Sequence, residues 1–405
     1  MKRIYMDNAA TSAVDNEVFK EMIPYFSEKY GNASSLHSFG QEAHEALDIA
    51  RERAAKLINS DINEIVFTSG GSESDNMAIK EIMFLNRDKG NHFITSKIEH
   101  PAIIRTAEFL EKRGFEVSYI DVDDKGFVNP KDVEAVITDK TVLVSIMHAN
   151  NEIGTIEPIE KIGDICKKKK VLFHTDAVQT VGKIPIDVKK INVDLLSASS
   201  HKLHGPKGVG FLYVRKGINI GSLIHGGSHE FGKRAGTENI TGIVGFGKAC
   251  EIALNEMDKN IEYVSELRDK LIKGILKSIP KSYINGDKEK RLPNNAHFRF
   301  DFIEGEAMLL RLDMEGIAGS TGSACSTKSL KPSHVLTSIG LKAVQAHGSL
   351  RLTLSKYNTK EEIDYVMGKL PQIICSLRKI SPLNEENVDS FPDNEENNHD
   401  VVEHE

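Results

Sequence analysis

The sequence predicts an α/β fold in which a large domain with a mostly parallel, seven-stranded sheet is joined to a smaller α+β domain. Between residues 64 and 214, short apolar runs alternate with helical patterns, which is typical of crossover units around a parallel sheet. After about Ile261 this alternation ends, and a long helical pattern leads into a shorter mixed region. The expected units are a large domain over 15–260, a small domain over 1–14 and 261–383, and an acidic, disordered tail over 384–405.

The elements of the large domain follow from hydrophobic periodicity. Between Gln41 and Asn59, apolar side chains recur at helical spacing, which predicts an amphipathic helix with one buried face. The predicted strands are the apolar runs 64–68, 92–95, 117–121, 142–147, 171–174, 193–197 and 209–214. A parallel sheet gathers its ligands at the carboxyl ends of its strands, so the polar residues that follow these runs are candidates for a site.

Composition limits the classes of protein that fit. Of the 405 residues, 40% are hydrophobic and 27% charged, which is enough for more than one core. No apolar run approaches the roughly 20 residues that span a bilayer, so we expect a cytoplasmic protein without membrane contact. The chain has a net charge of −7, but residues 384–405 alone hold nine acidic residues and no lysine or arginine. Residues 1–383 are therefore close to neutral, and their charge does not predict nucleic acid binding. The four cysteines are widely spaced and form no CxxC pair, which predicts neither a zinc site nor a disulfide framework.

The first predicted strand is followed by a glycine pair, Gly70 and Gly71, with Ser72 at the start of a helical pattern. Free backbone N–H groups and the helix dipole at such a position favour a bound phosphate group. A capped helix start gives the same pattern, and the stretch is not a Walker loop because no Gly-Lys-Ser/Thr follows. The motif therefore predicts a phosphate cup only in combination with other residues.

Two polar residues follow other predicted strands. Asp176 comes after the fifth strand, where a buried carboxylate is costly unless a cation faces it. A protonated heteroaromatic nitrogen is such a cation, whereas helix N-capping is the alternative role for an aspartate here. His100 follows the second strand and precedes a proline. The alternative to a stacking or catalytic role for His100 is that of a structural turn residue.

Lys202 lies in the turn 199–210, between two histidines, behind two serines and ahead of a glycine-rich stretch with a proline. Strand patterns on both sides place it at a strand end, although a solvated loop lysine is the commoner role. A lysine, a carboxylate for a ring nitrogen, a stacking histidine and a phosphate cup are what pyridoxal 5′-phosphate requires. A metal site of His174, His201 and His204 is the competing interpretation, but it lacks nearby cysteine or paired carboxylate ligands.

The stretch 319–332 is rich in small residues, and we expect it to form a mobile loop. Cys325 lies in it among hydroxyl side chains and near two lysines, which favour the thiolate form. Cys166, Cys250 and Cys375 have apolar neighbours at helical spacing, so we expect these three to be packed in the interior. Cys325 is therefore the candidate nucleophile.

Together these stretches resemble the cysteine desulfurases of the NifS/IscS type, within the class-V pyridoxal-phosphate-dependent enzymes. The resemblance covers about residues 5–383 and follows the same order along the chain. The matching stretches are 5–11, 31–40, 68–76, 148–154, 174–182, 199–210, 234–239, 320–336 and 351–359. The long loop around Cys325 resembles the first of the two groups of these enzymes. The resemblance implies fold type I, the fold of aspartate aminotransferase, and a homodimer.

The resemblance also implies a role for each site residue. Lys202 would bond the cofactor, Asp176 would pair with the pyridine nitrogen, and His100 would stack on the ring and shuttle protons. Asn151 and Arg351 would bind the substrate carboxylate, which the fork of an arginine fits well. The remaining implied cofactor-binding residues are Gln179 at the ring hydroxyl, and Gly71, Ser72, Ser199, His201 and, from the second subunit, Thr237 at the phosphate.

The implied reaction removes sulfur from L-cysteine and gives alanine and a persulfide on Cys325. That sulfur would then pass to an iron–sulfur scaffold protein or another acceptor, such as one for tRNA thiolation. No resident metal site is implied, and Cys325 would meet an iron–sulfur cluster only in passing. A selenocysteine lyase or a class-V aminotransferase of the same fold is the alternative, and a non-catalytic relay protein is disfavoured because no reacting group is missing.

Overall fold

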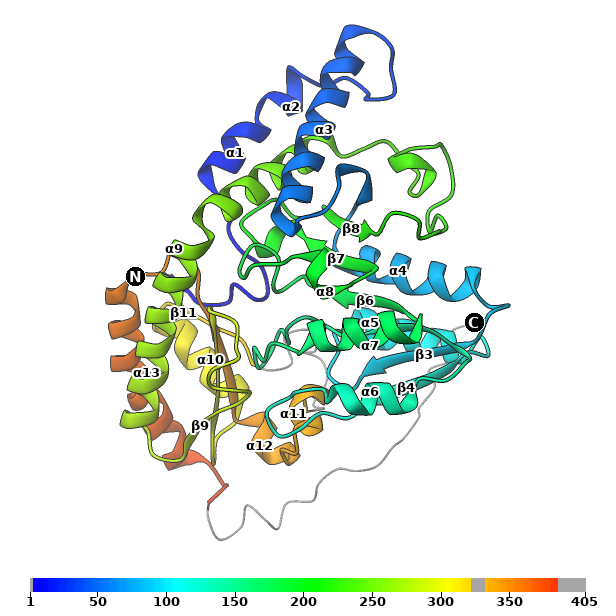
Figure 1. The fold of residues 1–405 in the computed structure, drawn as a ribbon. Helices are drawn as coiled ribbons and strands as arrows, with labels where there is room; N and C mark the ends of the chain where they lie inside the picture. Colours follow the sequence, from blue (N-terminus) through cyan, green and yellow to red (C-terminus); the bar gives the residue numbers. More distant parts are fainter. Residues whose placement is uncertain (1–2, 322–331, 385–405) are drawn as a thin grey trace, which may run out of the picture.

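A seven-stranded sheet lies at the centre of the molecule, as the sequence predicts (Figure 1). The structure is a computed structural model that describes residues 3–321 and 332–384, so Cys325 and the acidic tail lie outside the described residues. The strand order is β2-β8-β7-β6-β5-β3-β4. The bounds are β2 (Ile65–Thr68), β3 (His92–Ser96), β4 (Glu116–Ile120), β5 (Thr141–Ser145), β6 (Leu172–Asp176), β7 (Leu195–Ser199) and β8 (Gly210–Val214). Each predicted run overlaps one of these strands.

Strand β8 runs antiparallel to both of its neighbours, whereas the other pairs in this sheet are parallel. Residues 200–209 join β7 to β8, and so short a connection cannot hold the crossover that a parallel pair needs. The connection contains η2 (Ser200–Lys202), a single turn of 3₁₀ helix that ends at Lys202. The reversal of β8 therefore leaves this lysine at the carboxyl end of β7.

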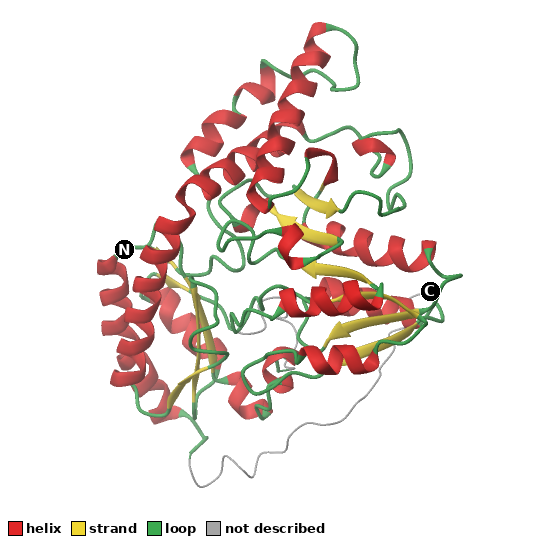
Figure 2. Cartoon of the chain, in the orientation of Figure 1, coloured by secondary structure: helices red, strands yellow, loops and turns green. Residues whose placement is uncertain are grey.

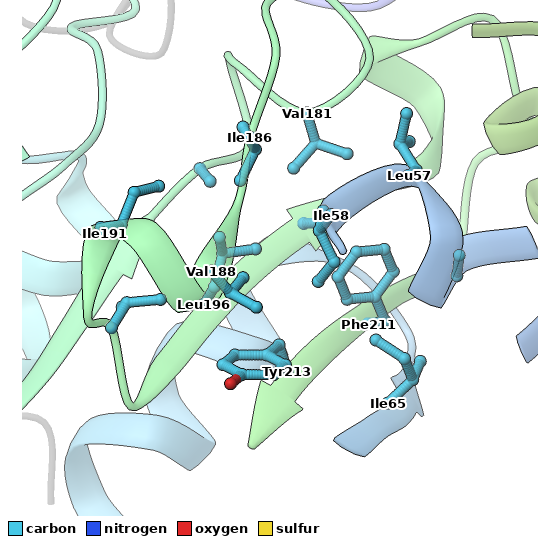
Figure 3. Close-up of a cluster of buried hydrophobic side chains, with 14 of the residues drawn as sticks. Leu57, Ile58, Ile65, Val181, Ile186, Val188, Ile191, Leu196, Phe211 and Tyr213 are labelled. Carbon is cyan, nitrogen blue, oxygen red and sulfur yellow. The ribbon is translucent and has the colours of Figure 1, made fainter. Parts of the chain in front are cut away.

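Helices cover the central sheet, and several follow a strand in the order of a crossover unit (Figure 2). Helix α3 (Ser38–Ile58) confirms the amphipathic helix predicted over 41–59. The other helices of this part are α1 (Asn16–Met22), α2 (Pro24–Ser27), η1 (Ile62–Glu64), α4 (Gly71–Leu85), α5 (Pro101–Glu111), α6 (Pro130–Val136), α7 (Ile159–Lys169), α8 (Val188–Ile191) and η3 (Glu230–Gly232). The apolar face of α3 packs on the sheet, where Leu57 and Ile58 lie near Ile65 and Phe211 (Figure 3).

Helix α9 (Ile240–Ser278) passes without a break from one hydrophobic core to another. Its side chains up to Met257 belong to the core beneath the large sheet, and those from Val264 onward belong to the second core. The second core is built with β9 (Ser282–Ile284), β10 (Asn295–Phe300), α10 (Gly305–Met314), β12 (Ser349–Thr353) and α13 (Lys360–Ile380). These elements form the group at the left of Figure 1. The two short helices α11 (His334–Ser338) and α12 (Ala343–His347) lie between the two groups.

The first described residues cross to this second group. Strand β1 (Ile4–Tyr5) pairs with β11 (Ile317–Ala318), and Asp7 forms a bridge with Thr353. Strands β9, β10 and β12 form a separate antiparallel sheet. Within residues 3–321 and 332–384, no helix is long and apolar enough to cross a membrane.

Candidate active site

A cavity of about 270 Å³ opens where several strands of the central sheet end. It confirms the expectation that the carboxyl ends of the parallel strands carry the polar cluster. Ala9 and Ala10, from the first loop of the chain, also line it. The structure brings ten of the predicted site residues to this cavity: Gly71, Ser72, His100, Asn151, Asp176, Gln179, Ser199, His201, Lys202 and Arg351.

One end of the cavity has the chemistry of an anion site. Gly71 and Ser72 are the first residues of α4, where backbone N–H groups have no partner within the helix. A Cβ atom at Gly71 would lie 2.6 Å from Cγ2 of Val178, so only glycine lets the backbone approach this closely. His201 Nδ1 lies 3.1 Å from Oγ1 of Thr11, and burial lowers the pKa of His201 to about 4. A phosphate group would therefore meet neutral donors at this end.

Asp176, the last residue of β6, offers a site for a positively charged group. Its carboxylate is buried and accepts a hydrogen bond of 2.9 Å from the backbone N–H of Val178. Burial raises its pKa, while the charges of His100 and Lys202 act in the other direction. A buried carboxylate of this kind is stabilised by a cation that faces it, and a protonated pyridine nitrogen fits that need.

His100 is held as a neutral ring beside Asp176. It is the N-cap of α5, where its Nδ1 accepts a hydrogen bond of 3.1 Å from the backbone N–H of Ala102. Burial lowers its pKa, against the charge of Asp176. Because Nδ1 accepts, the proton of the neutral ring lies on Nε2. His100 therefore has the structural role at a turn that the sequence left open as an alternative, and its ring also lines the cavity.

The ammonium group of Lys202 lies against the first loop of the chain. Nζ donates hydrogen bonds of 2.5 Å to the carbonyl oxygen of Ala9 and 2.8 Å to that of Ala10. The side chain is partly buried and its ammonium group is held by two carbonyl oxygens, so Lys202 is not a freely solvated loop lysine. Lys202 and both of these alanines line the cavity.

Arg351 is the largest fully buried side chain of the described chain, with an exposed fraction of 1%. Its guanidinium donates a 2.9 Å hydrogen bond to the carbonyl oxygen of Asn151 and forms a 3.0 Å ion pair with Asp7. Its Nε is buried without a hydrogen-bond partner. An orphaned donor on a buried arginine is suited to a carboxylate ligand, because each unpaired donor in the interior carries a desolvation cost.

Sequence reasoning gave no role to three ionisable residues that the fold brings to this region. Asp7 pairs with Arg351, and its place in a polar Asp-Asn-Ala-Ala-Thr stretch was the signal. Asp75 lines the cavity from α4, and burial together with the charge of Asp176 raises its pKa well above the usual value. Lys183 contacts Gln179 from the turn after β6. No periodicity points to these contacts, because most of them join segments far apart in the chain.

Among the residues that the structure describes, one predicted site residue is not brought to the cavity within one chain. Thr237 is exposed in the segment before α9 and is not among the lining residues. Cys325 lies outside the described residues. The expectation for the other cysteines holds for Cys166 and Cys250, which are buried, and is wrong for Cys375, which is exposed. Cys375 follows Ile373 and Ile374 on α13, and the next 100° of helical rotation turns it away from the core.

The histidines of the competing metal interpretation serve other contacts. His174 Nδ1 lies 2.8 Å from Oγ of Ser145, and its Nε2 lies 3.0 Å from Oγ of Ser197. Both ring nitrogens of this fully buried histidine are therefore used by serines. Among the residues that the structure describes, no group of three or more histidine, cysteine, aspartate or glutamate side chains could hold a metal ion.

Comparison of the sequence with known proteins identifies the family of this chain. The family model described as Aminotransferase class-V matches residues 4–366. A protein from Clostridium botulinum strain Hall, named cysteine desulfurase IscS, is 58% identical over 384 residues, which are 94% of this chain and 97% of that protein. The chain belongs to the cysteine desulfurases of the class-V aminotransferase family.

Solved structures give the same assignment. A NifS-like protein is 42% identical, with a TM-score of 0.88, over 93% of this chain and 100% of that chain. SspA in complex with cysteine is 36% identical, with a TM-score of 0.79, over 88% of this chain and 100% of that chain. The predicted fold type I is therefore confirmed. Enzymes of this family depend on pyridoxal 5′-phosphate, and the residues around the cavity fit that cofactor at its phosphate, its ring nitrogen and its point of attachment.

Proposed function

We propose that this chain converts L-cysteine to alanine and a persulfide on Cys325, and that the persulfide sulfur passes to an acceptor for iron–sulfur cluster assembly or another thiolated product. The observation that carries the proposal is the convergence of Lys202, Asp176 and Arg351 on one cavity. The names of the relatives, and the similar structure of SspA in complex with cysteine, support the choice of substrate. The acceptor and a cytoplasmic location stay predictions from the sequence.

Each protein group has a defined task in this proposal. Arg351 and Asn151 hold the substrate carboxylate, and the donors of the arginine fork fix the orientation of the amino acid. Pyridoxal 5′-phosphate, when bound, supplies the capacity to store the electrons of the Cα–H bond. The amine of Lys202 takes the α-proton and returns it, and His100 Nε2 holds a proton within reach of the reacting atoms. Asp176 keeps its negative charge towards the ring nitrogen.

Sulfur transfer itself needs a thiolate. The Cys325 thiolate attacks the sulfur of the substrate, so that an S–S bond forms and the C–S bond breaks. The electron pair left on carbon takes a proton, and alanine is then released. No external oxidant is consumed in this step, because the sulfur is passed on as a persulfide.

Replacing Cys325 tests the proposal directly. With pyridoxal 5′-phosphate, L-cysteine and dithiothreitol, the unmodified chain is expected to release equal amounts of alanine and sulfide. Cys325→Ala is expected to lose sulfide release by about 10³-fold or more, because the nucleophile is gone. Cys375→Ala, which removes an exposed cysteine of α13, is the matched control and is expected to keep full activity.

The same assay separates the alternatives. If Cys325→Ala releases sulfide from cysteine at the unmodified rate, the persulfide mechanism is wrong. Selenide release that survives in Cys325→Ala, together with negligible sulfide release by the unmodified chain, identifies a selenocysteine lyase. Formation of a keto acid in place of alanine identifies an aminotransferase. The three outcomes leave different products, which amino acid analysis distinguishes.

We also propose that the chain acts as a homodimer. Six large apolar side chains are exposed between residues 19 and 39, on or near the first three helices, and Leu36 is 93% exposed. Exposed apolar groups gathered in this way are typical of an interface. They are Phe19, Ile23, Phe26, Tyr30, Leu36 and Phe39. Sedimentation equilibrium is expected to give twice the chain mass of 44.9 kDa, and a monomeric mass would exclude a contribution of Thr237 from a second subunit.

A further inference from the structure

Lys183 is a partly buried cation next to the candidate site that the proposed reaction does not use. It lies in the turn between β6 and α8, and its Nζ donates a 3.1 Å hydrogen bond to Oε1 of Gln179. Desolvation lowers the pKa of Lys183 to about 7, and the positive charges of Lys202 and Arg351 act in the same direction. A lysine in such surroundings is unfavourable for the fold alone, so its position calls for a compensating anion.

The protein side of the site does not supply that anion. Within residues 3–321 and 332–384, no carboxylate forms an ion pair with Lys183. Its Nζ donates to the neutral amide of Gln179, and the charges that act on it are those of the two cations Lys202 and Arg351. Pyridoxal 5′-phosphate carries negative charge on its phosphate and on its ring hydroxyl. Arg351 already pairs with Asp7, so the bound cofactor would chiefly give Lys183 the negative charge that no described carboxylate supplies to it.

The hydrogen bond from Lys183 also decides which end of the Gln179 amide faces the cavity. An ammonium group can only donate, so it holds the oxygen of the amide and leaves the nitrogen on the opposite side. In agreement, Nε2 of Gln179 donates a 3.0 Å hydrogen bond to the carbonyl oxygen of Ala9, which lines the cavity. With the amide fixed in this way, Gln179 presents N–H donors, and not its oxygen, to a ligand.

We infer that Lys183 is a positioning residue for the cofactor: it fixes the amide of Gln179 so that an N–H group meets the ring hydroxyl, and it adds positive charge next to that oxygen. The inference rests on the proposed role of Gln179 as the partner of the ring hydroxyl. It assigns no contact between Lys183 and the substrate. Its effect acts on cofactor affinity and on the protonation of the bound cofactor, before any reaction takes place.

The test measures binding of pyridoxal 5′-phosphate to the cofactor-free chain for Lys183→Met, Gln179→Ala and the double variant. Lys183→Met is expected to weaken binding about tenfold, the size of effect of one hydrogen bond to a charged group. Gln179→Ala is expected to weaken it by a similar factor. The double variant is expected to lose less than the product of the two single losses, because part of the effect of Lys183 acts through Gln179. Lys183→Arg, which keeps the positive charge, is expected to bind the cofactor almost as tightly as the unmodified chain does.

The pH dependence of the cofactor's visible absorbance gives a second readout that a purely structural role would not move. Loss of the nearby positive charge favours the protonated form of the bound cofactor, so the midpoint is expected to shift to higher pH in Lys183→Met. Lys190→Met, which removes an exposed lysine of α8, is the matched control and is expected to change neither the affinity nor the midpoint.

Two results would overturn the inference: unchanged affinity and midpoint in Lys183→Met, or losses in the double variant that equal the product of the two single losses. If Lys183→Met fails to fold by circular dichroism, Lys183→Gln, which retains a hydrogen-bond donor without the charge, is measured in its place. Failure of the unmodified chain to bind pyridoxal 5′-phosphate would contradict the proposed function instead, so the two failures are distinguishable.

Discussion

Lys202→Ala is expected to lose alanine release from cysteine by about 10³-fold or more, because the amine that moves the α-proton is removed. The same change is expected to abolish covalent attachment of the cofactor. Borohydride reduction followed by mass spectrometry measures this directly, since the reduced adduct stays on the lysine that carried it. Pyridoxal 5′-phosphate is still expected to bind without a covalent bond, because the helix α4 N-terminus, Asp176 and His201 remain.

Lys216→Ala provides the control for Lys202. Lys216 follows β8, is exposed and lies outside the cavity, so its removal is expected to leave both the adduct and the activity unchanged. An adduct that persists in Lys202→Ala would show that another lysine carries the cofactor. Lys183 would then be the first candidate, since it lies next to the cavity and contacts Gln179, which lines it.

Asp176→Asn is expected to lower alanine release by about 10²-fold, the typical size of effect when one group that stabilises charge in the reaction is removed. Asparagine keeps the oxygen that accepts from the N–H of Val178, so the local backbone is expected to stay intact. What it lacks is the negative charge that holds a proton on the ring nitrogen. The visible spectrum of the bound cofactor is therefore expected to change together with the rate.

Asp194→Asn separates this effect from the general loss of a buried carboxylate. Asp194 is a buried residue just before β7, at the end of the sheet opposite the cavity, where it accepts a hydrogen bond from the N–H of Phe173. Its replacement is expected to lower thermal stability and to leave the cofactor spectrum unchanged. A spectrum of Asp176→Asn identical to that of the unmodified chain would contradict the assigned partner of the ring nitrogen.

The sequence was most informative where structure is local. All seven strands of the central sheet coincide with apolar runs. A strand buried on both faces has a continuous apolar signature, and this holds for every strand of the sheet except the partly exposed edge strand β4. The direction of β8 was not predicted in the same way, since periodicity does not depend on strand direction. Helix α9 was recognised only in its second half, after Ile261; its first half is rich in small residues and glycine, which give weak helical signals.

The site residues that the sequence predicted were likewise those with a local signal or a match to a known family. Asp176 and Lys202 were found from their positions at strand ends, and a resemblance to known enzymes added Arg351 and Gln179. Asp7 and Lys183 were missed because the fold determines what surrounds them: the Asp7–Arg351 pair joins residues 344 positions apart. The polar stretch around Asp7 does not indicate so distant a partner. Lys183 is only four residues from Gln179, but its position beside the charges of Lys202 and Arg351 depends on the fold.

The pairing of the first loop with β12 has a consequence for the order of events during biosynthesis. Asn8 donates a hydrogen bond to the carbonyl oxygen of Thr353, across 345 positions, and Asp7 pairs with Arg351 on the same strand. Asp7 and Asn8 are made more than 340 residues before these partners, so they must remain without them until β12 has left the ribosome. Closing contacts of such long range is slow, so the large sheet can form well before the site is complete. A nascent chain that stops short of β12 would hold the lysine but lack the arginine.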